Sequence, residues 1–109
     1  MNVVQTVEAL SALANEHRLG VFRLLVQAGP EGMSAGEIAD ALELPASSLS
    51  FHLAHLNRAG LIAQRRESRS LIYSADFAAM SALIGFLTEN CCGGKNCAPA
   101  AQPKKRKAS

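Results

Sequence analysis

The sulfur chemistry of this chain is gathered near its C-terminal end. All three cysteines, Cys91, Cys92 and Cys97, lie within seven residues. Thiolates are soft ligands, and three of them suit a trivalent metalloid such as arsenite or antimonite, which binds three sulfurs in a pyramid. Cys91 and Cys92 are adjacent and can reach one centre together, and Gly93-Gly94 lets the backbone turn so that a third sulfur joins them. The sequence therefore predicts an As(III) or Sb(III) site on these cysteines.

Other uses of the cysteine trio stay open at this point. Zinc is disfavoured because a structural zinc ion takes four ligands and no histidine lies near the cysteines. Cadmium, lead or another soft cation could use the same three sulfurs. A redox switch through a Cys91–Cys92 or Cys92–Cys97 disulfide is a further alternative, although a bond between adjacent cysteines is strained. The odd, clustered count is unlike a secreted disulfide framework and favours a reducing, cytoplasmic setting.

A second set of polar side chains lies at the start of a helix predicted over residues 46–59. Leu49, Leu53 and Leu56 have the spacing of a buried stripe, so other positions of this helix face outward. Short hydroxyl side chains at a helix N-terminus can reach phosphates or base edges in a DNA major groove. The alternative is a serine-rich helix start that is only capped and solvated. We interpret the segment as a DNA-reading helix that uses Ser47, Ser48, Ser50, Phe51 and His52.

Three arginines surround the turn of a β-hairpin predicted directly after this helix. Residues 61–75 carry strand-forming residues on both sides of the turn Glu67-Ser68-Arg69. Basic side chains on an exposed turn are often only solvated. Their place next to a candidate recognition helix instead favours contacts with phosphates or the minor groove. The hairpin is therefore predicted to be a DNA-binding wing that uses Arg65, Arg66 and Arg69.

Further helices are predicted on either side of these elements. Apolar spacing predicts one helix over residues 3–14 and a second that starts after Asn15 and stops at Gly29-Pro30. Ser34 and Glu37 have the spacing of a capping box, which starts a third helix. Asp76 begins a last helix whose apolar spacing continues to Leu87.

The order of these elements predicts the fold class. Four helices, a hairpin and a helix are assembled most simply as a winged helix-turn-helix, a mainly α fold with a β-hairpin wing (α+β). Residues 1–90 form the predicted DNA-binding and dimerisation domain, and residues 91–109 a flexible, cysteine-containing tail with a basic end. The first and last helices carry apolar stripes outside the DNA-reading unit, so we expect a homodimer through them.

Composition sets limits on the function. A length of 109 residues with 49% apolar content fits one small domain with a packed core. The net charge is +2, but residues 1–90 carry six arginines against nine acids, and the tail holds the run Lys104-Lys105-Arg106-Lys107. No signal peptide or membrane-spanning run is present. The chain also carries no phosphate loop, nucleophile elbow or evident carboxylate pair, so we do not expect an enzyme.

Three stretches resemble the signature segments of a known family, the ArsR/SmtB metal-responsive repressors. They are ALANEHRLGVFRLL, SLSFHLAHLNRAGLI and RRESRSLIYS, and the similarity runs from about Leu10 to Tyr73. The resemblance implies a winged-helix homodimer that binds an inverted-repeat operator and releases it when an inducer binds. Phe51 departs from the family pattern, because many members carry a polar or basic residue there.

The placement of the cysteines implies a subtype within this family. The best-known arsenic sensors carry Cys-x-Cys on the first helix of the helix-turn-helix, where this chain has Ser34-Ala35-Gly36. The chain is similar instead to members with a Cys-Cys pair and a third cysteine just after the last helix. The family's zinc site on the last helix needs Asp and His ligands, of which only Asp76 matches. The resemblance thus implies an arsenite-responsive or antimonite-responsive repressor, with a redox-responsive repressor and an arsenite carrier that does not bind DNA as alternatives.

Overall fold

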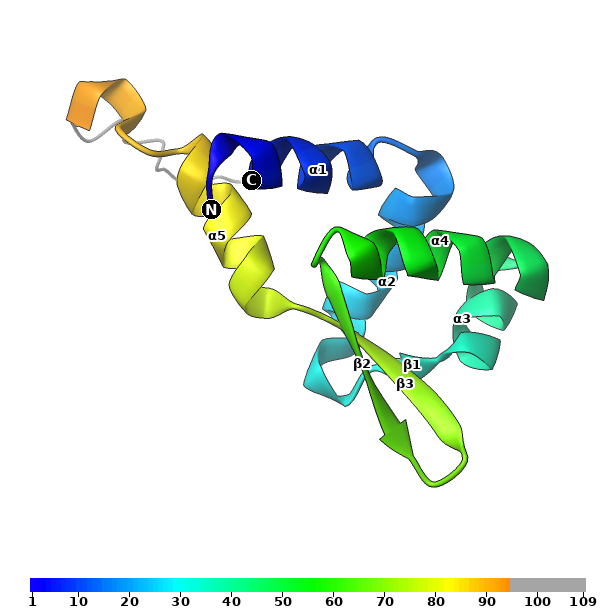
Figure 1. Cartoon of the computed structure of the whole chain (residues 1–109). Coiled ribbons are helices and arrows are strands. Elements are labelled where there is room, and N and C mark those ends of the chain that lie inside the picture. Colours follow the sequence, from blue (N-terminus) through cyan, green and yellow to red (C-terminus); the bar gives the residue numbers. More distant parts are fainter. Residues whose placement is uncertain (95–109) are drawn as a thin grey trace, which may run out of the picture.

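The computed structural model describes residues 1–94, which form five α-helices, two short 3-10 helices and a small three-stranded sheet. Figure 1 shows the arrangement. The elements in chain order are α1 (Val3–Leu13), α2 (Glu16–Ala28), η1 (Gly29–Glu31), β1 (Met33–Ser34), α3 (Ala35–Leu42), α4 (Ala46–Arg58), β2 (Ile62–Glu67), β3 (Ser70–Ala75), α5 (Phe77–Leu87) and η2 (Cys91–Gly94). The winged helix-turn-helix predicted from the sequence is confirmed.

Four of the α-helices, α1, α2, α3 and α5, begin where side-chain caps satisfy their first backbone N–H groups. Asn15 accepts hydrogen bonds from the backbone of His17 and Arg18 at the start of α2. Ser34 and Glu37 form the predicted capping box of α3, and Asp76 caps α5. Each cap supplies an acceptor for N–H groups that have no partner inside the helix. These starts agree with the sequence prediction.

The sheet has three strands rather than the two of the predicted hairpin. β2 and β3 pair antiparallel from Ile62 opposite Ala75 to Glu67 opposite Ser70, with the turn at Ser68 and Arg69. The short strand β1 adds to the other edge of β3, where Met33 pairs with Tyr73. Two residues are too few to show alternation in a sequence, so this strand was not predicted. β1 ties the wing to the chain that leads into α3.

The core lies where α2, α3, α4 and the base of the hairpin meet. Its largest fully buried side chains are Val21, Leu25, Ile38, Leu49, Leu56 and Leu61. On α2, Val21 is buried, whereas Leu19, whose helical spacing with Phe22 and Leu25 predicts a place in the same apolar stripe, is 43% exposed. The stripe shifts because α2 is contacted by α1, α3, α4 and β3 on different sides. This core fixes α4 in relation to the wing.

α1 packs inward through small residues and turns its large apolar side chains outward. Thr6, Ala9 and Ala12 are buried, whereas Val3, Val4, Val7 and Leu10 are all at least 41% exposed. On α5, Ile84 and Leu87 are likewise more than half exposed. Figure 1 shows α1 and α5 together at one end of the molecule and the hairpin tip projecting at the other. No helix within residues 1–94 is long and apolar enough to span a membrane.

Candidate DNA-binding surface and cysteine site

α3 and α4 form a helix-turn-helix whose second helix presents a polar N-terminal half. The turn passes through Glu43 in a left-handed conformation (φ 55°), and α4 starts after Pro45, which offers no side-chain cap. Leu49, Leu53 and Leu56 are buried as predicted. The first backbone N–H groups of α4 therefore have no side-chain acceptor, and a helix N-terminus of this kind attracts phosphate oxygens.

The predicted DNA-reading side chains divide into two groups. Ser47, Ser48, Ser50 and Phe51 are all exposed, and Phe51 is 73% exposed. Ser50 also lines a hollow of about 260 Å³ between α4 and the sheet, which is completed by Leu53, Ala54, Asn57, Gln64 and Tyr73. Ser50 is thus the predicted DNA-reading residue that borders the hollow between α4 and the sheet.

His52 differs from these residues because it is half-buried against α2. Its ring lies 5.5 Å from the ring of His17, centroid to centroid, and its Nδ1 is buried with no hydrogen-bond partner. Desolvation lowers the pKa of His52, and the nearby charges of His17, Arg18 and His55 lower it further. No local pattern in the sequence predicts the contact between His17 and His52, because the two residues are distant in the chain. His52 thus packs on α2, and its contact with DNA remains a prediction.

The three wing arginines have different surroundings. Arg65 donates from Nε to the carboxylate of Glu67 at 2.8 Å, and its two terminal nitrogens donate to the backbone carbonyls of Pro30 and Glu31 at 3.2 and 2.7 Å. Arg66 and Arg69 make no hydrogen bond or ion pair with any residue from 1 to 94. The guanidinium of Arg65 therefore fastens the wing to η1, whereas the charges of Arg66 and Arg69 are available to a partner.

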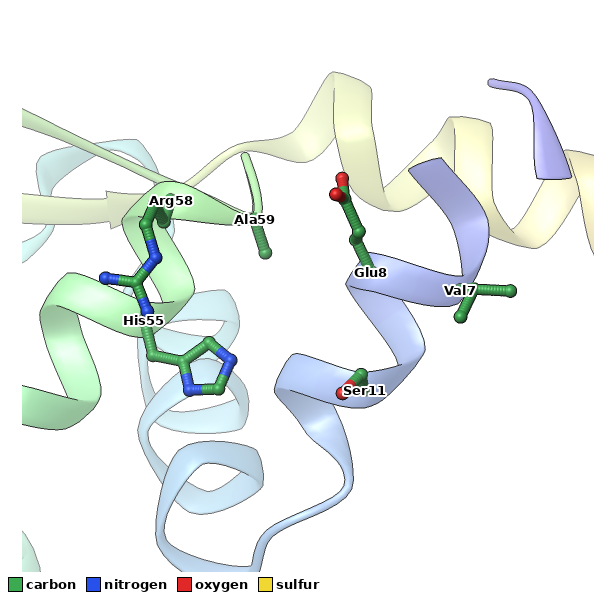
Figure 2. A pocket seen from close by; sticks show the side chains of 6 residues that line it. All are labelled: Val7, Glu8, Ser11, His55, Arg58 and Ala59. Atoms are coloured by element: carbon green, nitrogen blue, oxygen red, sulfur yellow. The ribbon is translucent and has the colours of Figure 1, made fainter. Parts of the chain in front are cut away.

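A cavity of about 350 Å³ lies between α1 and α4. Figure 2 shows the imidazole of His55 and the hydroxyl of Ser11 turned toward one another across it, while the carboxylate of Glu8 points away from both. Desolvation lowers the pKa of His55, with further contributions from Arg18 and Arg58. No hydrogen bond joins these described side chains into a nucleophile–base set, so the cavity offers no catalytic arrangement.

Two of the three predicted metalloid ligands lie together just beyond α5. The sulfurs of Cys91 and Cys92 are 3.8 Å apart, and both residues are exposed. Two sulfurs this close can reach one soft centre after small side-chain rotations. The backbone turns through left-handed conformations at Cys92 (φ 56°) and Gly93 (φ 66°). Cys97 lies outside the described residues, and residues 1–94 hold no cluster of three metal ligands.

Comparisons with known proteins place this arrangement in a family. Residues 13–65 match the family described as a helix-turn-helix domain. The transcriptional activator HlyU of Vibrio cholerae is 37% identical over 86 residues, which are 79% of this chain and 77% of HlyU. A solved structure of HlyU covers 82% of this chain and 94% of its own, at 36% identity and a TM-score of 0.65. The NMR structure of homodimeric Mb0332 from Mycobacterium bovis, a possible ArsR-family regulator, is 26% identical with a TM-score of 0.64, over 88% of this chain and 89% of that chain.

This chain belongs to the ArsR-like winged helix-turn-helix transcriptional regulators. Its relatives are transcriptional regulators by name, which agrees with the expectation of a regulator rather than an enzyme. A shorter match joins this ArsR-like regulator to the putative arsenical resistance operon repressor ArsR of Halobacterium salinarum. The two are 38% identical over 63 residues, which are 58% of this chain and 48% of that protein. The matches therefore establish the family of this domain.

Proposed function

We propose that this ArsR-like regulator is a homodimeric repressor that binds operator DNA and releases it when arsenite or antimonite binds its C-terminal cysteines. The observation that carries the inducer assignment is the pair of sulfurs 3.8 Å apart directly after α5. In the same protomer, α1 and α5 carry exposed apolar side chains. The sensor and the proposed dimer interface are thus neighbours in the fold.

The homodimer is supported by the outward face of α1 and α5. An apolar surface of this kind on a small domain is covered in most proteins by a partner. Val3, Val4, Val7, Ile84 and Leu87 are each more than half exposed in the protomer. Mb0332, a relative of the same fold, is described as homodimeric. A two-fold arrangement through these helices presents two copies of α4 to two operator half-sites.

The DNA contacts follow from the outer face of α4 and the wing. Ser47, Ser48 and Ser50 are short, exposed donors and acceptors at the start of a helix whose N-terminus is open to phosphate. We assign phosphate or minor-groove contacts to Arg66 and Arg69, whose guanidinium groups make no hydrogen bond or ion pair within residues 1–94. Arg65 is instead assigned to holding the wing in position, because its guanidinium nitrogens already donate to Glu67 and to the backbone of η1.

The inducer site combines the described cysteine pair with Cys97. Three sulfurs and no nearby histidine suit a three-coordinate soft centre, which As(III) and Sb(III) prefer. Reducing conditions such as those of the cytoplasm keep cysteines available as thiols, and binding then displaces their protons. The two-residue glycine segment gives the chain the freedom to bring a third sulfur back.

A chain of packed elements joins the sulfurs to the DNA-reading helix. The cysteines follow α5, α5 contacts α1, and α1 contacts α4 beside the cavity at Ser11 and His55. Ordering the tail around a metalloid shifts α5 and α1 at the interface, and the two copies of α4 lose the spacing of about one DNA turn that the half-sites require. A coupling free energy of about 1–3 kcal/mol lowers operator affinity about 5–150-fold.

The proposal is tested first by counting the ligands of the bound metalloid. X-ray absorption on the arsenite-loaded protein is expected to show three sulfur neighbours and no oxygen or nitrogen neighbour. Operator binding is then titrated with arsenite-free protein. Arsenite added under reducing conditions is expected to weaken binding, whereas peroxide added without arsenite or reductant is not. Release by peroxide alone would identify a redox switch instead, and a protein that binds arsenite but protects no DNA in footprinting would be a carrier.

A further inference from the structure

One large apolar side chain lies on the face of α4 that is proposed to meet DNA. Phe51 is 73% exposed, the largest exposed fraction among the large apolar side chains of residues 1–94. Most of the others lie on α1 and α5, where the proposed dimer covers them. The dimer does not account for Phe51, because this residue is in the first half of α4 beside the exposed serines. The ring needs a different partner.

The position of Phe51 on the helix turns it toward the same surface as Ser47 and Ser48. Residues three and four apart share one face of an α-helix. Leu49 and Leu53, on either side of Phe51 in sequence, are buried and define the opposite face. Ser47, Ser48 and Phe51 therefore form one outward patch with two hydroxyls and one ring.

The ring is also oriented by its neighbours. Phe51 contacts His52 edge-on, with ring centroids 6.4 Å apart and planes at 70°. His52 lies in turn against His17 at the start of α2. Phe51 therefore borders this pair of rings at one edge, while most of its own surface stays open to a partner.

Only one kind of group in the DNA major groove is apolar and can therefore be the partner of such a ring. Base edges there present hydrogen-bond donors and acceptors. An apolar ring would displace water from them without replacing the lost hydrogen bonds, which is unfavourable. The 5-methyl group of thymine is the apolar group among them, and aromatic side chains contact it. We propose that Phe51 packs on a thymine methyl group and makes thymine a requirement at one position of each operator half-site. This inference rests on the proposed operator binding by α4.

The test uses the full-length protein and duplex DNA alone. A preferred operator is selected from a random duplex library, and each thymine is then replaced in turn by uracil, which lacks only the methyl group. One position per half-site is expected to lose about fourfold in affinity, the effect of burying about one methyl group. Replacing both symmetry-related thymines is expected to multiply the two losses to about sixteenfold. Equal affinity for thymine and uracil at every position would overturn the proposal.

Substitution at residue 51 then assigns the effect to the ring. Phe51→Ala is expected to bind the thymine and uracil operators equally, whereas the control Ser48→Ala is expected to bind both more weakly and to keep the difference between them. Phe51 is exposed, so its removal leaves the core intact, and the uracil series on the native protein does not depend on any variant. A methyl effect that persists in Phe51→Ala would contradict the assignment. Selection of no sequence at all would overturn operator binding as well as thymine reading.

Discussion

At the scale of single residues, the pattern of charges on the wing predicts that the arginines lie on one surface. It does not predict which of them binds DNA and which holds the wing in place. The sequence placed Arg65, Arg66 and Arg69 around one turn, and the structure keeps them on one hairpin. It also joins Arg65 to carbonyls 34 and 35 residues earlier in the chain. No local pattern could predict that contact, because it depends on how η1 and β2 meet in space.

The different surroundings of these arginines predict different salt dependences of DNA binding. Each phosphate contact adds about one unit to the slope of log affinity against log salt concentration. Arg66→Gln or Arg69→Gln is expected to lower that slope by about one per protomer. Arg65→Gln is expected to weaken binding with little change in slope, because it loosens the wing. Fluorescence anisotropy over a salt series measures both, and an equal drop in slope for Arg65→Gln would show that it contacts phosphate.

The half-buried ring of His52 predicts a pH dependence of stability. Its pKa is lowered in the folded protein, so the unfolded chain binds more protons as the pH falls through the ordinary value of 6.5. The contribution of neutral His52 is fully present above that pH and is lost toward lower pH. We expect the free energy of unfolding to fall less between pH 7 and pH 5 in His52→Gln than in the native protein, in urea titrations. If the free energy of unfolding fell equally between pH 7 and pH 5 in the variant and in the native protein, the burial of this ring would be contradicted.

At the scale of elements, the sequence located the long helices and the hairpin but not the strand β1. Asn15, Ser34 and Asp76 mark their helices because each cap is a local hydrogen bond between neighbouring residues. The hairpin was visible because two six-residue stretches, with strand-forming residues in both, lie on either side of a turn. β1 depends on Tyr73 and Ile72, about 40 residues away, and its sequence carries no signal of its own.

The close approach of β1 to β3 depends on Gly32. A Cβ atom at this position would lie 2.3 Å from the carbonyl oxygen of Tyr73, and the backbone has a φ of +72°. Gly32→Ala is therefore expected to destabilise the fold by about 2 kcal/mol or more in urea unfolding. Gly60→Ala is the matched control, because its φ is +79° but nothing lies within 4 Å of the added Cβ. It should cost only about 1 kcal/mol, and equal losses at the two sites would mean that the β1–β3 contact is not tight.

At the scale of the whole molecule, the proposed operator binding requires two copies of the chain acting together. The spacing of Val4, Val7, Leu10 and Leu13 predicts the apolar stripe of α1. The structure leaves the first three side chains exposed on the protomer and packs Leu13 partly against the core. The inward face consists of Thr6, Ala9 and Ala12, whose small side chains give a weaker apolar pattern in the sequence. A single sequence shows that α1 has an apolar stripe. It does not show whether that stripe packs on the core of the same chain or faces a second chain.

Charge placed on this outer face should separate the protomers. Val7→Asp is expected to shift the molecule from dimer to monomer at micromolar concentration, because the interface would bury an unpaired carboxylate. Leu71→Asp serves as the control, since Leu71 is 37% exposed on the wing, far from α1. Sedimentation velocity measures the state of both variants, and circular dichroism checks that each is folded. A dimeric Val7→Asp protein would place the interface elsewhere.

The central claim is that binding of a soft metalloid by the cysteines after α5 releases the operator. The most direct measurement is the operator affinity, with and without arsenite, of the native protein and of the variant with Cys91, Cys92 and Cys97 all changed to serine. Without arsenite both proteins are expected to bind equally. Arsenite is expected to lower the affinity of the native protein about 5–150-fold and to leave the variant unchanged. Release of the serine variant by arsenite, or no release of the native protein, would contradict the account.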